Sequence, residues 1–513
     1  MSMRVAVVGG GLTGIGCLVE LLDAGHDVRL YERNDDIGGV WHPSNCYSGL
    51  SLHGAAAAFE YHDFPLPDSV DKARPMTSGQ VYDYLRSYYR HNGLDEYSEF
   101  ETEVEKISYS TAARKYTLRT RKRGSDEVRS AEFDYVVYTH GFAARTLPKV
   151  EGSDQFAGEI FHSFDITEAK LAELAAANKK IVVVGGSKTA TDLILRFHRH
   201  GCLTKWLYRK NYWFIRSDPL IDIATRRVAG RSGGLFHRTA LFVGELLGTK
   251  MPRLHLALWR ACGLAHTFGP PHWDFTKYHR GRIETAAMAT LTQYAAEHGA
   301  QGEIARFATD GLELTDGRKL DCDAVVFCTG SSAHESLTAI EEDGAAFDMG
   351  SVRQMYRARV IPDLPGLIFT AFHLFSFGVV NGLMTGRWVA RYIDSRFGES
   401  YLAEHATTYD APFFAGPSYL FDSSTPFNVR AGKMLEPFFQ SGELQKWVYF
   451  KWLWEISFAR GGVPPLDILA PRTADTIASR AHAKDLSRRP RGLPLPRDRN
   501  RPAQDTAVRD VRL

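Results

Sequence analysis

Apolar residues recur along this chain in short runs that end at glycines and lead into helical patterns. Residues 4–8 are apolar and β-rich, a helical pattern follows a glycine turn and ends at Gly25, and "DVRLYE" at 27–32 has the pattern of a second strand. The same order returns in "VVVGGSKTATDL" at 182–193, which leads to the strand "TKWLYRK" at 204–210. The pattern predicts two βαβ units, which are typical of parallel sheets.

Other segments fit around these two units. "EYSEFETEVEKISY" and "KYTLRTRK" predict antiparallel strands, and apolar runs predict buried strands at 133–141, 319–330 and 366–373. "LMTGRWVARYIDSRF" predicts a helix. Residues 150–167 are polar and rich in turn formers, so we expect a linker there.

Two long stretches break the alternation of strands and helices. Residues 211–300 mix Trp, Phe and Leu with arginines and are expected to be a helical insertion in the second unit. Residues 410–470 are aromatic and helical in pattern, with their aromatic side chains in the core or at an oligomer contact. From Arg472 the chain is rich in Arg and Pro without apolar periodicity, which predicts disorder.

Composition narrows the class of protein. The 513 residues are too many for one ordinary core, so two or more domains are expected. The net charge of +2 gives no bias toward nucleic acid, and the six cysteines form no CxxC pair and no metal-ligand spacing. Neither a signal peptide pattern nor a run of about 18 apolar residues is visible, so we expect a cytoplasmic protein without a membrane anchor.

The first glycine turn has the spacing of a dinucleotide site. Gly9, Gly11 and Gly14 fit GxGxxG, in which the glycines permit the turn, the close approach of a pyrophosphate, and tight helix–strand packing. Glu32 ends the second strand, where an acid binds ribose hydroxyls. "GGVW" at 38–41 suggests a second close approach with Trp41 against a flat ring, or else a surface turn with a core tryptophan.

The second glycine turn differs at two positions. Ser187 stands at the second glycine and Ala190 at the third, while Lys188 and Thr189 supply donors for phosphate. The strand that follows ends in Arg209-Lys210 rather than in an acid. Because Arg accommodates a 2′-phosphate that an acid would repel, this half predicts NADPH and the first half FAD. The alternative is a solvated strand end.

At this point the chain resembles a family. Phe156, Gly158 and His162 match most of the FxGxxxHxxx(Y/F/W) fingerprint of class B flavin monooxygenases, and "FHS.D" is closest to the flavin-containing monooxygenase branch. "GGVW", "DFPLP", "VYDYL" and "CTG" are similar too, in matching order over roughly residues 4–400. The fingerprint's last aromatic is Ile166 here, whereas Trp there marks Baeyer–Villiger enzymes.

The resemblance implies the chemistry. NADPH reduces FAD, the reduced flavin captures O2, and a C4a-hydroperoxide gives one oxygen atom to the substrate. The branch favours N-hydroxylation of a small amine or amino-acid-like substrate, with S-oxygenation or Baeyer–Villiger oxidation of a ketone as alternatives. Leu52-His53 replaces the usual Thr-Asn, so His53 is the candidate catalytic residue, or a structural one.

The resemblance and the motifs together assign the cofactor contacts. The expected FAD- and NADPH-binding residues are Gly9, Gly11, Leu12, Thr13, Gly14, Glu32, Arg33, Gly39, Val40, Trp41, Val104, Gly185, Ser187, Lys188, Thr189, Ala190, Arg209, Lys210, Thr329 and Gly330.

The expected fold is α/β, with two Rossmann-like dinucleotide-binding domains, the second inserted in the first. The expected parts are the FAD-binding domain at 1–165 and 326–410, the NADPH-binding domain at 166–325 with its helical insertion, a helical segment at 411–471 and a disordered tail at 472–513.

Other classes of protein fit less well. A flavin disulfide reductase needs a paired redox-cysteine motif, which Cys322 and Cys328 do not form. A non-catalytic dinucleotide sensor that binds a partner through its Arg-rich tail is also disfavoured, because such a protein does not need two intact nucleotide turns. The arginines of the insertion either hold a substrate carboxylate or face solvent.

Overall fold

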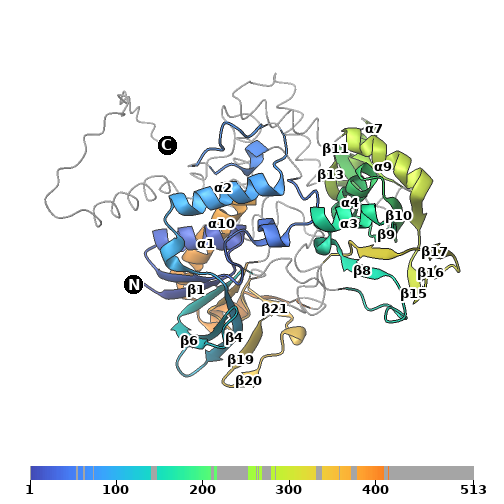
Figure 1. Ribbon diagram of the computed structural model, residues 1–513. Coiled ribbons are helices and arrows are strands. Elements are labelled where there is room, and N and C mark those ends of the chain that lie inside the picture. The colour runs from blue at the N-terminus through green and yellow to red at the C-terminus, as the bar shows by residue number, and fades with distance from the viewer. Residues whose placement is uncertain are drawn as a thin grey trace, which may run out of the picture. The chain divides into compact units, whose positions relative to one another are not determined.

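A computed structural model gives the fold of the protein (Figure 1). The structure describes residues 2–52, 56–61, 64–72, 74–139, 147–209, 213–216, 252–261, 263, 265–268, 279–283, 285–330, 338–356, 359–370, 378–408 and 414. The chain forms two compact units, Met1–Pro471 and Arg472–Leu513, and all described residues belong to the first. The predicted tail and all but one residue of the segment 411–471 lie outside the described residues.

The first βαβ unit belongs to a five-stranded parallel sheet. Its order is β22-β7-β1-β2-β3. The strands are β1 (Arg4–Val8), β2 (Asp27–Tyr31), β3 (Ser98–Glu99), β7 (Tyr135–Tyr138) and β22 (Leu367–Phe369). Helix α1 (Leu12–Asp23) connects β1 to β2. The apolar runs of β1 and β7 are buried, as their composition predicts.

Helix α1 packs closely against α10 (Gly378–Ser395) through glycines (Figure 1). A Cβ on Gly16 would lie 2.2 Å from the carbonyl carbon of Gly382, and a Cβ on Gly386 would lie 2.4 Å from the oxygen of Gly16. Only glycine permits this approach. The buried side chains of Glu20 and Arg387 form an ion pair across the same contact, with 2.9 Å between Oε2 and Nε.

The second βαβ unit belongs to a second five-stranded parallel sheet, in the order β14-β10-β9-β18-β8. The strands are β8 (Glu159–His162), β9 (Lys180–Val184), β10 (Leu203–Tyr208), β14 (Gly299–Gln301) and β18 (Ala324–Phe327). Its helices are α3 (Glu168–Ala176), α4 (Lys188–Arg199) and α9 (Thr285–His298). The chain leaves the first sheet after β7 and returns at β22, so the second unit is inserted in the first. The predicted fold class is confirmed.

Two predictions about connecting segments were wrong. Residues 159–162, within the expected linker, form β8, because a strand of only four residues at the edge of a sheet has no clear periodic pattern. The expected helical insertion contains α7 (Pro252–Ala261) and α9, but also β11 (Trp213–Arg216), β12 (Ala265–His266) and β13 (His279–Ile283). These strands pair with one another, and β14 joins the second sheet.

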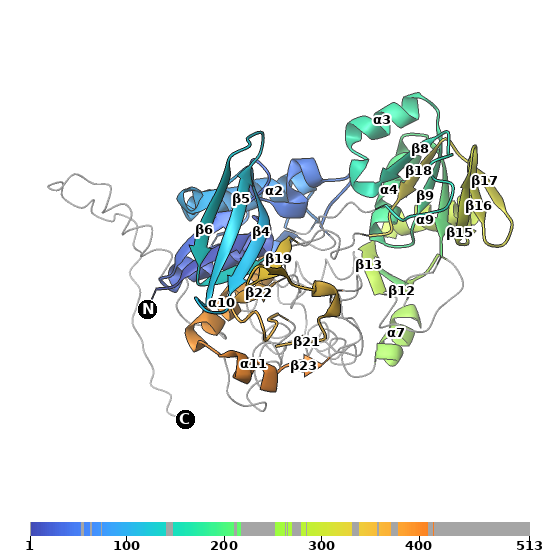
Figure 2. The same cartoon turned by 90° about the horizontal axis from the view of Figure 1, so that it is seen from below.

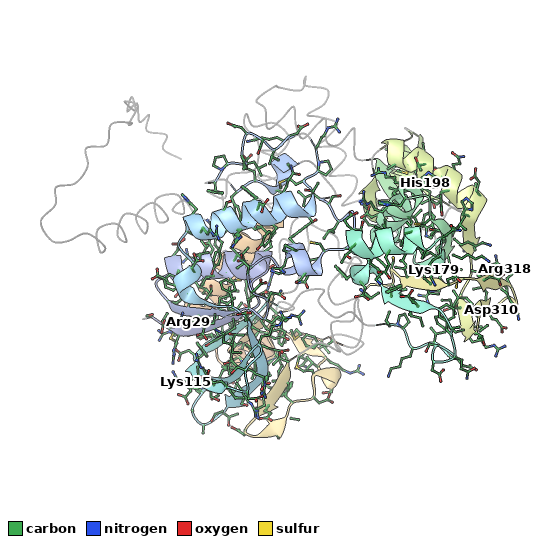
Figure 3. All side chains as sticks on the ribbon, in the orientation of Figure 1. Arg29, Lys115, Lys179, His198, Asp310 and Arg318 are labelled. Carbon is green, nitrogen blue, oxygen red and sulfur yellow. The ribbon has the colours of Figure 1, made fainter. Side chains whose placement is uncertain are left out.

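The antiparallel strands predicted before β7 are confirmed. β4 (Thr102–Ser110), β5 (Lys115–Lys122) and β6 (Val128–Phe133) form a meander, which β19 (Ala339–Glu342) and β20 (Ala345–Ala346) extend (Figure 2). Figure 3 labels Lys115 in this meander and Arg29 in the first sheet. Both side chains lie on the outside of their sheets.

Smaller elements complete the described fold. They are α2 (Ser78–His91), α11 (Glu399–Glu404), β15 (Ile304–Ala308), β16 (Gly311–Leu314), β17 (Lys319–Asp321), β21 (Gln354–Met355) and β23 (Thr407–Thr408). Helix α2 begins with a capping box, in which Thr77 and Gln80 satisfy each other's backbone donors. Across the described residues, no helix is long and apolar enough to cross a membrane.

Candidate active site

The first glycine turn lies at the carboxyl end of β1. Gly9 adopts φ +104°, which favours glycine, and donates its N–H to the carbonyl of Tyr31 over 2.8 Å. A Cβ on Gly14 would lie 1.9 Å from the oxygen of Gly9, so the third glycine is needed for close packing of helix on strand. Both roles are those expected of a dinucleotide-binding turn.

Glu32 lies beside this turn with only 5% of its surface exposed. Its Oε2 accepts the N–H of Gly10 over 2.6 Å, and its Oε1 accepts the N–H of Asn34 over 2.8 Å. A carboxylate has about four acceptor positions, so capacity remains for ribose hydroxyls. The acid is held at the carboxyl end of β2, where a nucleotide bound at the Gly9 turn would place its ribose.

The "GGVW" turn packs directly on the first glycine turn. Gly38 donates its N–H to the carbonyl of Gly10 over 2.9 Å. Gly39 has φ +58°, and a Cβ on it would lie 2.9 Å from the Cα of Gly11. Trp41 is partly exposed and meets Phe59 edge to face, with 6.3 Å between ring centroids. The two turns therefore form one cradle, and Trp41 is not a core residue.

The remaining residues predicted for FAD differ in position. Leu12 and Thr13 are half-buried in the first turn of α1, and Arg33 is exposed. Val40 is 37% exposed beside the cradle. Val104 is buried in the core of the meander, and its carbonyl accepts the hydroxyl of Thr338 over 3.2 Å.

The geometry of this cradle fits FAD. The first N–H groups of α1 have no intrahelical acceptor and carry the positive end of the helix dipole, which suits a pyrophosphate. Among the residues that the structure describes, a Cβ on Gly11 would meet only the Cα of Gly39, at 3.6 Å, so these residues leave that position open to a ligand.

The second glycine turn lies at the carboxyl end of β9. Gly185 has φ +139°, donates to the carbonyl of Leu207 over 2.8 Å, and would place a Cβ 2.6 Å from the oxygen of Cys328. Ser187 caps α4 at φ −97°, a conformation open to any residue, and its hydroxyl makes no capping hydrogen bond. Serine is therefore unstrained at this position, and Ala190 is fully buried where helix and strand meet.

Lys188 and Thr189 begin α4 beside this turn. The ammonium of Lys188 pairs with the carboxylate of Asp192, one helical turn further along α4. Burial raises the pKa of Asp192, while Lys188 and the Tyr47 hydroxyl act to lower it. Thr189 is half-buried.

Arg209 follows β10 at the same edge of the sheet. Its guanidinium lies 3.1 Å from Glu303, and both side chains are more than half exposed. Exposed pairs are weak and screened by solvent, so a phosphate can replace Glu303 as the partner of Arg209. Lys210, like the catalytic candidate His53, lies outside the described residues.

Thr329 and Gly330 follow β18, so they lie at the carboxyl edge of the second sheet. The carbonyl of Gly330 accepts the Nε2–H of His162 over 3.1 Å, and Nδ1 of that histidine accepts the N–H of Phe164. These partners assign the proton to Nε2. The fingerprint histidine is buried and ties β8 to the end of β18, which is a structural role.

The described cysteines do not form a redox pair. Burial raises the pKa of Cys322 to about 12, with nearby aspartates adding to the shift, and raises that of Cys328 further. Both thiols therefore stay protonated at neutral pH, which disfavours disulfide-reductase chemistry. No group of His, Cys, Asp and Glu side chains within the described residues has the arrangement of a metal site.

Sequence reasoning missed the residues that join the two halves. Tyr47 and Ser48 follow the "GGVW" turn but contact α3 and α4 of the second half. Asp192 accepts the Tyr47 hydroxyl over 3.0 Å. The only signal in the sequence was the Lys188–Asp192 spacing of four residues, which is typical of an ion pair on a helix.

Comparison with known proteins agrees with this site. Residues 2–213 match the family model "FMO-like: Flavin-binding monooxygenase-like". This part of the chain is therefore similar to flavin-binding monooxygenases. The matched residues include both glycine turns and the fingerprint histidine, and the predicted cofactors FAD and NADPH are those of this family.

The individual proteins that this chain is similar to are distant in sequence. The chain is 28% identical to a 4-hydroxybenzoate brominase (decarboxylating) of Marinomonas mediterranea, over 64% of this chain and 63% of that protein. It is 23% identical to the probable flavin-containing monooxygenase 1 of Arabidopsis thaliana, over 77% of this chain and 83% of that protein. The crystal structure of OTEMO in complex with FAD and NADP covers 77% of this chain and 86% of its own, at 18% identity and a TM-score of 0.58, which shows a shared fold.

Proposed function

We propose that this monooxygenase hydroxylates the nitrogen of a small amine or amino-acid-like substrate, using NADPH and O2. The observation that carries the proposal is the pair of nucleotide turns in one chain. One turn lies beside the buried acid Glu32, and the other lies beside Arg209. An acid suits the ribose of FAD, whereas an arginine suits the 2′-phosphate of NADPH.

Each half of the chain has its own task. Bound FAD supplies the transfer of electrons from NADPH to O2 and of one oxygen atom to the substrate. The first cradle holds it through the Gly9 turn, the α1 amides and Glu32. The second turn presents the α4 amides and Arg209 to NADPH. Because the cofactor carries the chemistry, the protein needs only to position the two nucleotides and the substrate, exclude water from the site and tune the polarity around the flavin.

Support for an amine over a ketone comes from Ile166. It stands at the fingerprint position where Baeyer–Villiger enzymes have Trp, and it is fully buried in the core of the second half. Ile166 departs from the aromatic of the fingerprint, and the absence of Trp at this position argues against Baeyer–Villiger chemistry. The amine must arrive unprotonated, because its lone pair takes up the oxygen atom.

The test compares substrate classes on the FAD-loaded protein. Primary amines, amino acids, thioethers and cyclic ketones are each incubated with NADPH, and products are identified by mass and fragmentation. The proposal expects an amine product heavier by one oxygen, with NADPH consumed in equal amount. An ester or lactone from a ketone, or a sulfoxide as the main product, would replace N-hydroxylation with one of the two alternatives.

The similarity to a brominase adds one further assay to the substrate panel. That relative is named for 4-hydroxybenzoate, so this acid is included with bromide. A brominated, decarboxylated product would assign the chain to that chemistry and reject amine hydroxylation.

A further inference from the structure

Residues 47–49, which we call the strap, leave the FAD cradle and lie on the NADPH half. Tyr47 is 5% exposed within the core of the second half and meets Phe164 edge to face, with ring centroids 5.6 Å apart. Ser48 donates its N–H to the carbonyl of Ile166 over 2.7 Å. Gly49 has φ +85°, and the side chain of Arg196 fills the space where its Cβ would lie. The strap is therefore an ordered part of the second half.

The hydroxyl of Ser48 adds a polar contact on the same side. It donates to Glu168 over 2.8 Å and accepts Nε–H of Arg196 over 3.1 Å. Arg196 and Glu168 also pair with each other. Glu168 begins α3 and Arg196 lies in α4, so the strap bridges both helices.

Asp192 contacts both the strap and the first residue after the second glycine turn. Its Oδ2 accepts the Tyr47 hydroxyl over 3.0 Å, and its other oxygen accepts the ammonium of Lys188, the first residue of α4. The Asp192 and Lys188 side chains are only 10% and 13% exposed. A buried carboxylate needs such partners, because burying it without them is strongly unfavourable.

The same carboxylate is therefore bonded to the residue that follows the NADPH turn and to the segment that follows the FAD cradle. We propose that Asp192 is a positioning residue, and that its hydrogen bond with Tyr47 fixes the FAD cradle relative to the NADPH turn so that hydride transfer between the two nucleotides is fast. This inference rests on the proposed NADPH and FAD sites. It adds a residue that touches neither the substrate nor the reacting atoms.

Tyr47→Phe is the sharpest variant, because it removes one hydroxyl and leaves the ring, the Lys188–Asp192 pair and both nucleotide turns in place. The matched control is Tyr294→Phe. Tyr294 is buried in the same core, and its hydroxyl donates to the carbonyl of Thr204 within the second half. Both variants lose one buried tyrosine hydroxyl, but only one of them loses the contact between the halves.

The first readout needs no cofactor. Hydrogen exchange of the strap amides is measured in wild-type protein and in both variants. A hydrogen bond to a charged acceptor is worth enough to change local opening about tenfold. Tyr47→Phe is expected to speed exchange of the strap about tenfold, and Tyr294→Phe to leave it unchanged. Equal exchange of the strap in Tyr47→Phe and wild type would overturn the proposal.

The second readout separates binding from positioning. Anaerobic flavin reduction by NADPH is followed by rapid mixing at saturating NADPH, and NADP+ binding is measured by calorimetry. Tyr47→Phe is expected to slow reduction about tenfold while the NADP+ Kd stays within about twofold. Asp192→Asn, the second variant, should slow reduction as well. Asp192→Asn also removes the charge that pairs with Lys188. The double variant should therefore be no slower than Asp192→Asn alone, because the Tyr47 contact is already lost there.

The outcomes distinguish this proposal from the proposed function. If NADPH does not reduce the flavin of the wild-type protein, the proposed function fails whatever the strap does. If the wild-type flavin is reduced and Tyr47→Phe is reduced equally fast, Asp192 is not a positioning residue. Additive effects in the double variant would also overturn the proposal.

Discussion

Gly38 donates its backbone N–H to the carbonyl of Gly10 over 2.9 Å, which joins the two glycine turns of the first half into a single cradle. The turns are separated by a helix and a strand along the chain, and the buried Glu32 also bonds to Gly10. The cradle therefore forms only when β1, α1 and β2 are packed together. FAD binding should depend on small changes within the cradle that do not disturb the fold.

Gly11→Ala tests this dependence. Within the described part of the chain the new Cβ would meet only the Cα of Gly39, at an ordinary 3.6 Å, so the apoprotein should keep its Tm. The methyl group would lie where the pyrophosphate approaches, so FAD occupancy after purification should fall about tenfold or more. Gly14→Ala is the contrasting variant, because its Cβ would lie 1.9 Å from the Gly9 oxygen and should destabilise the fold itself. Full FAD occupancy in Gly11→Ala would contradict the assignment of the cradle.

Glu32→Gln tests the buried acid. Both carboxylate oxygens accept backbone N–H groups, from Gly10 and Asn34, and an amide can replace only one of those acceptors. The variant should lose about 1–3 kcal/mol of unfolding free energy and bind FAD more weakly. Urea unfolding of the apoprotein and FAD titration measure the two effects separately. Unchanged stability and unchanged FAD affinity would together show that Glu32 is not held as described.

Arg209→Gln tests nucleotide selectivity. If Arg209 holds the 2′-phosphate, KM for NADPH should rise about tenfold to hundredfold, since hydrogen bonds to charged groups are worth about 1.5–3 kcal/mol. KM for NADH should stay the same, because NADH has no such phosphate. Arg306→Gln is the matched control, as Arg306 is another exposed arginine of the second half and is paired with Glu313. An equal rise in KM for NADPH and NADH would assign Arg209 a structural role instead.

Arg387→Met tests the ion pair between α1 and α10. The side chains of Arg387 and Glu20 are only 4% and 6% exposed, so removing the guanidinium leaves a buried carboxylate without this partner. The expected loss of unfolding free energy is about 3–5 kcal/mol. Arg391→Met, at an exposed position of the same helix, should cost less than about 0.5 kcal/mol. Similar losses in both variants would show that burial of the pair does not matter.

Glu168 predicts a pH dependence of stability. Burial acts to raise the pKa of Glu168, but the Ser48 hydroxyl and Arg196 outweigh it, His200 adds to them, and the pKa lies below its ordinary 4.5. A lowered pKa means that the ionised group stabilises the folded state above the ordinary pKa and that this contribution disappears as the pH falls through the folded pKa. The carboxylate is largely exposed, so the effect is small.

The measurement is the difference in Tm between wild-type protein and Glu168→Gln across pH. The wild type should be the more stable at neutral pH, and the difference should shrink below the ordinary pKa. A difference that grows toward acid pH would have the wrong sign for this contact.

The sequence predicted what depends on local pattern. The buried strands β1, β7, β9 and β18, together with the two glycine turns, follow directly from apolar runs that end at glycines. The pattern predicts a linker where the short edge strand β8 lies, because two apolar residues between Glu159 and His162 carry no periodic signal and owe their conformation to pairing with β18. Local pattern could not show that pairing.

The site was predictable to the same extent. Glu32 and the glycines could be proposed as site residues because their expected chemistry depends on spacing along the chain. Tyr47 and Asp192 were missed because they lie 145 positions apart and meet only through the tertiary fold. The sequence predicts the Lys188 side chain as a phosphate donor, but the buried carboxylate of Asp192, one helical turn away, competes with any phosphate for its ammonium.

We propose that one chain couples NADPH oxidation to the transfer of one oxygen atom from O2 to an amine. The most direct measurement supplies isotopically heavy O2 to the FAD-loaded protein with NADPH and the best amine of the substrate panel, and then weighs the product. We expect one heavy oxygen atom in each hydroxylated amine, and none when the label is supplied in water. The proposal would be contradicted by product oxygen derived from water. It would also be contradicted if, with every amine, all the NADPH oxidised went to reduce O2 to hydrogen peroxide.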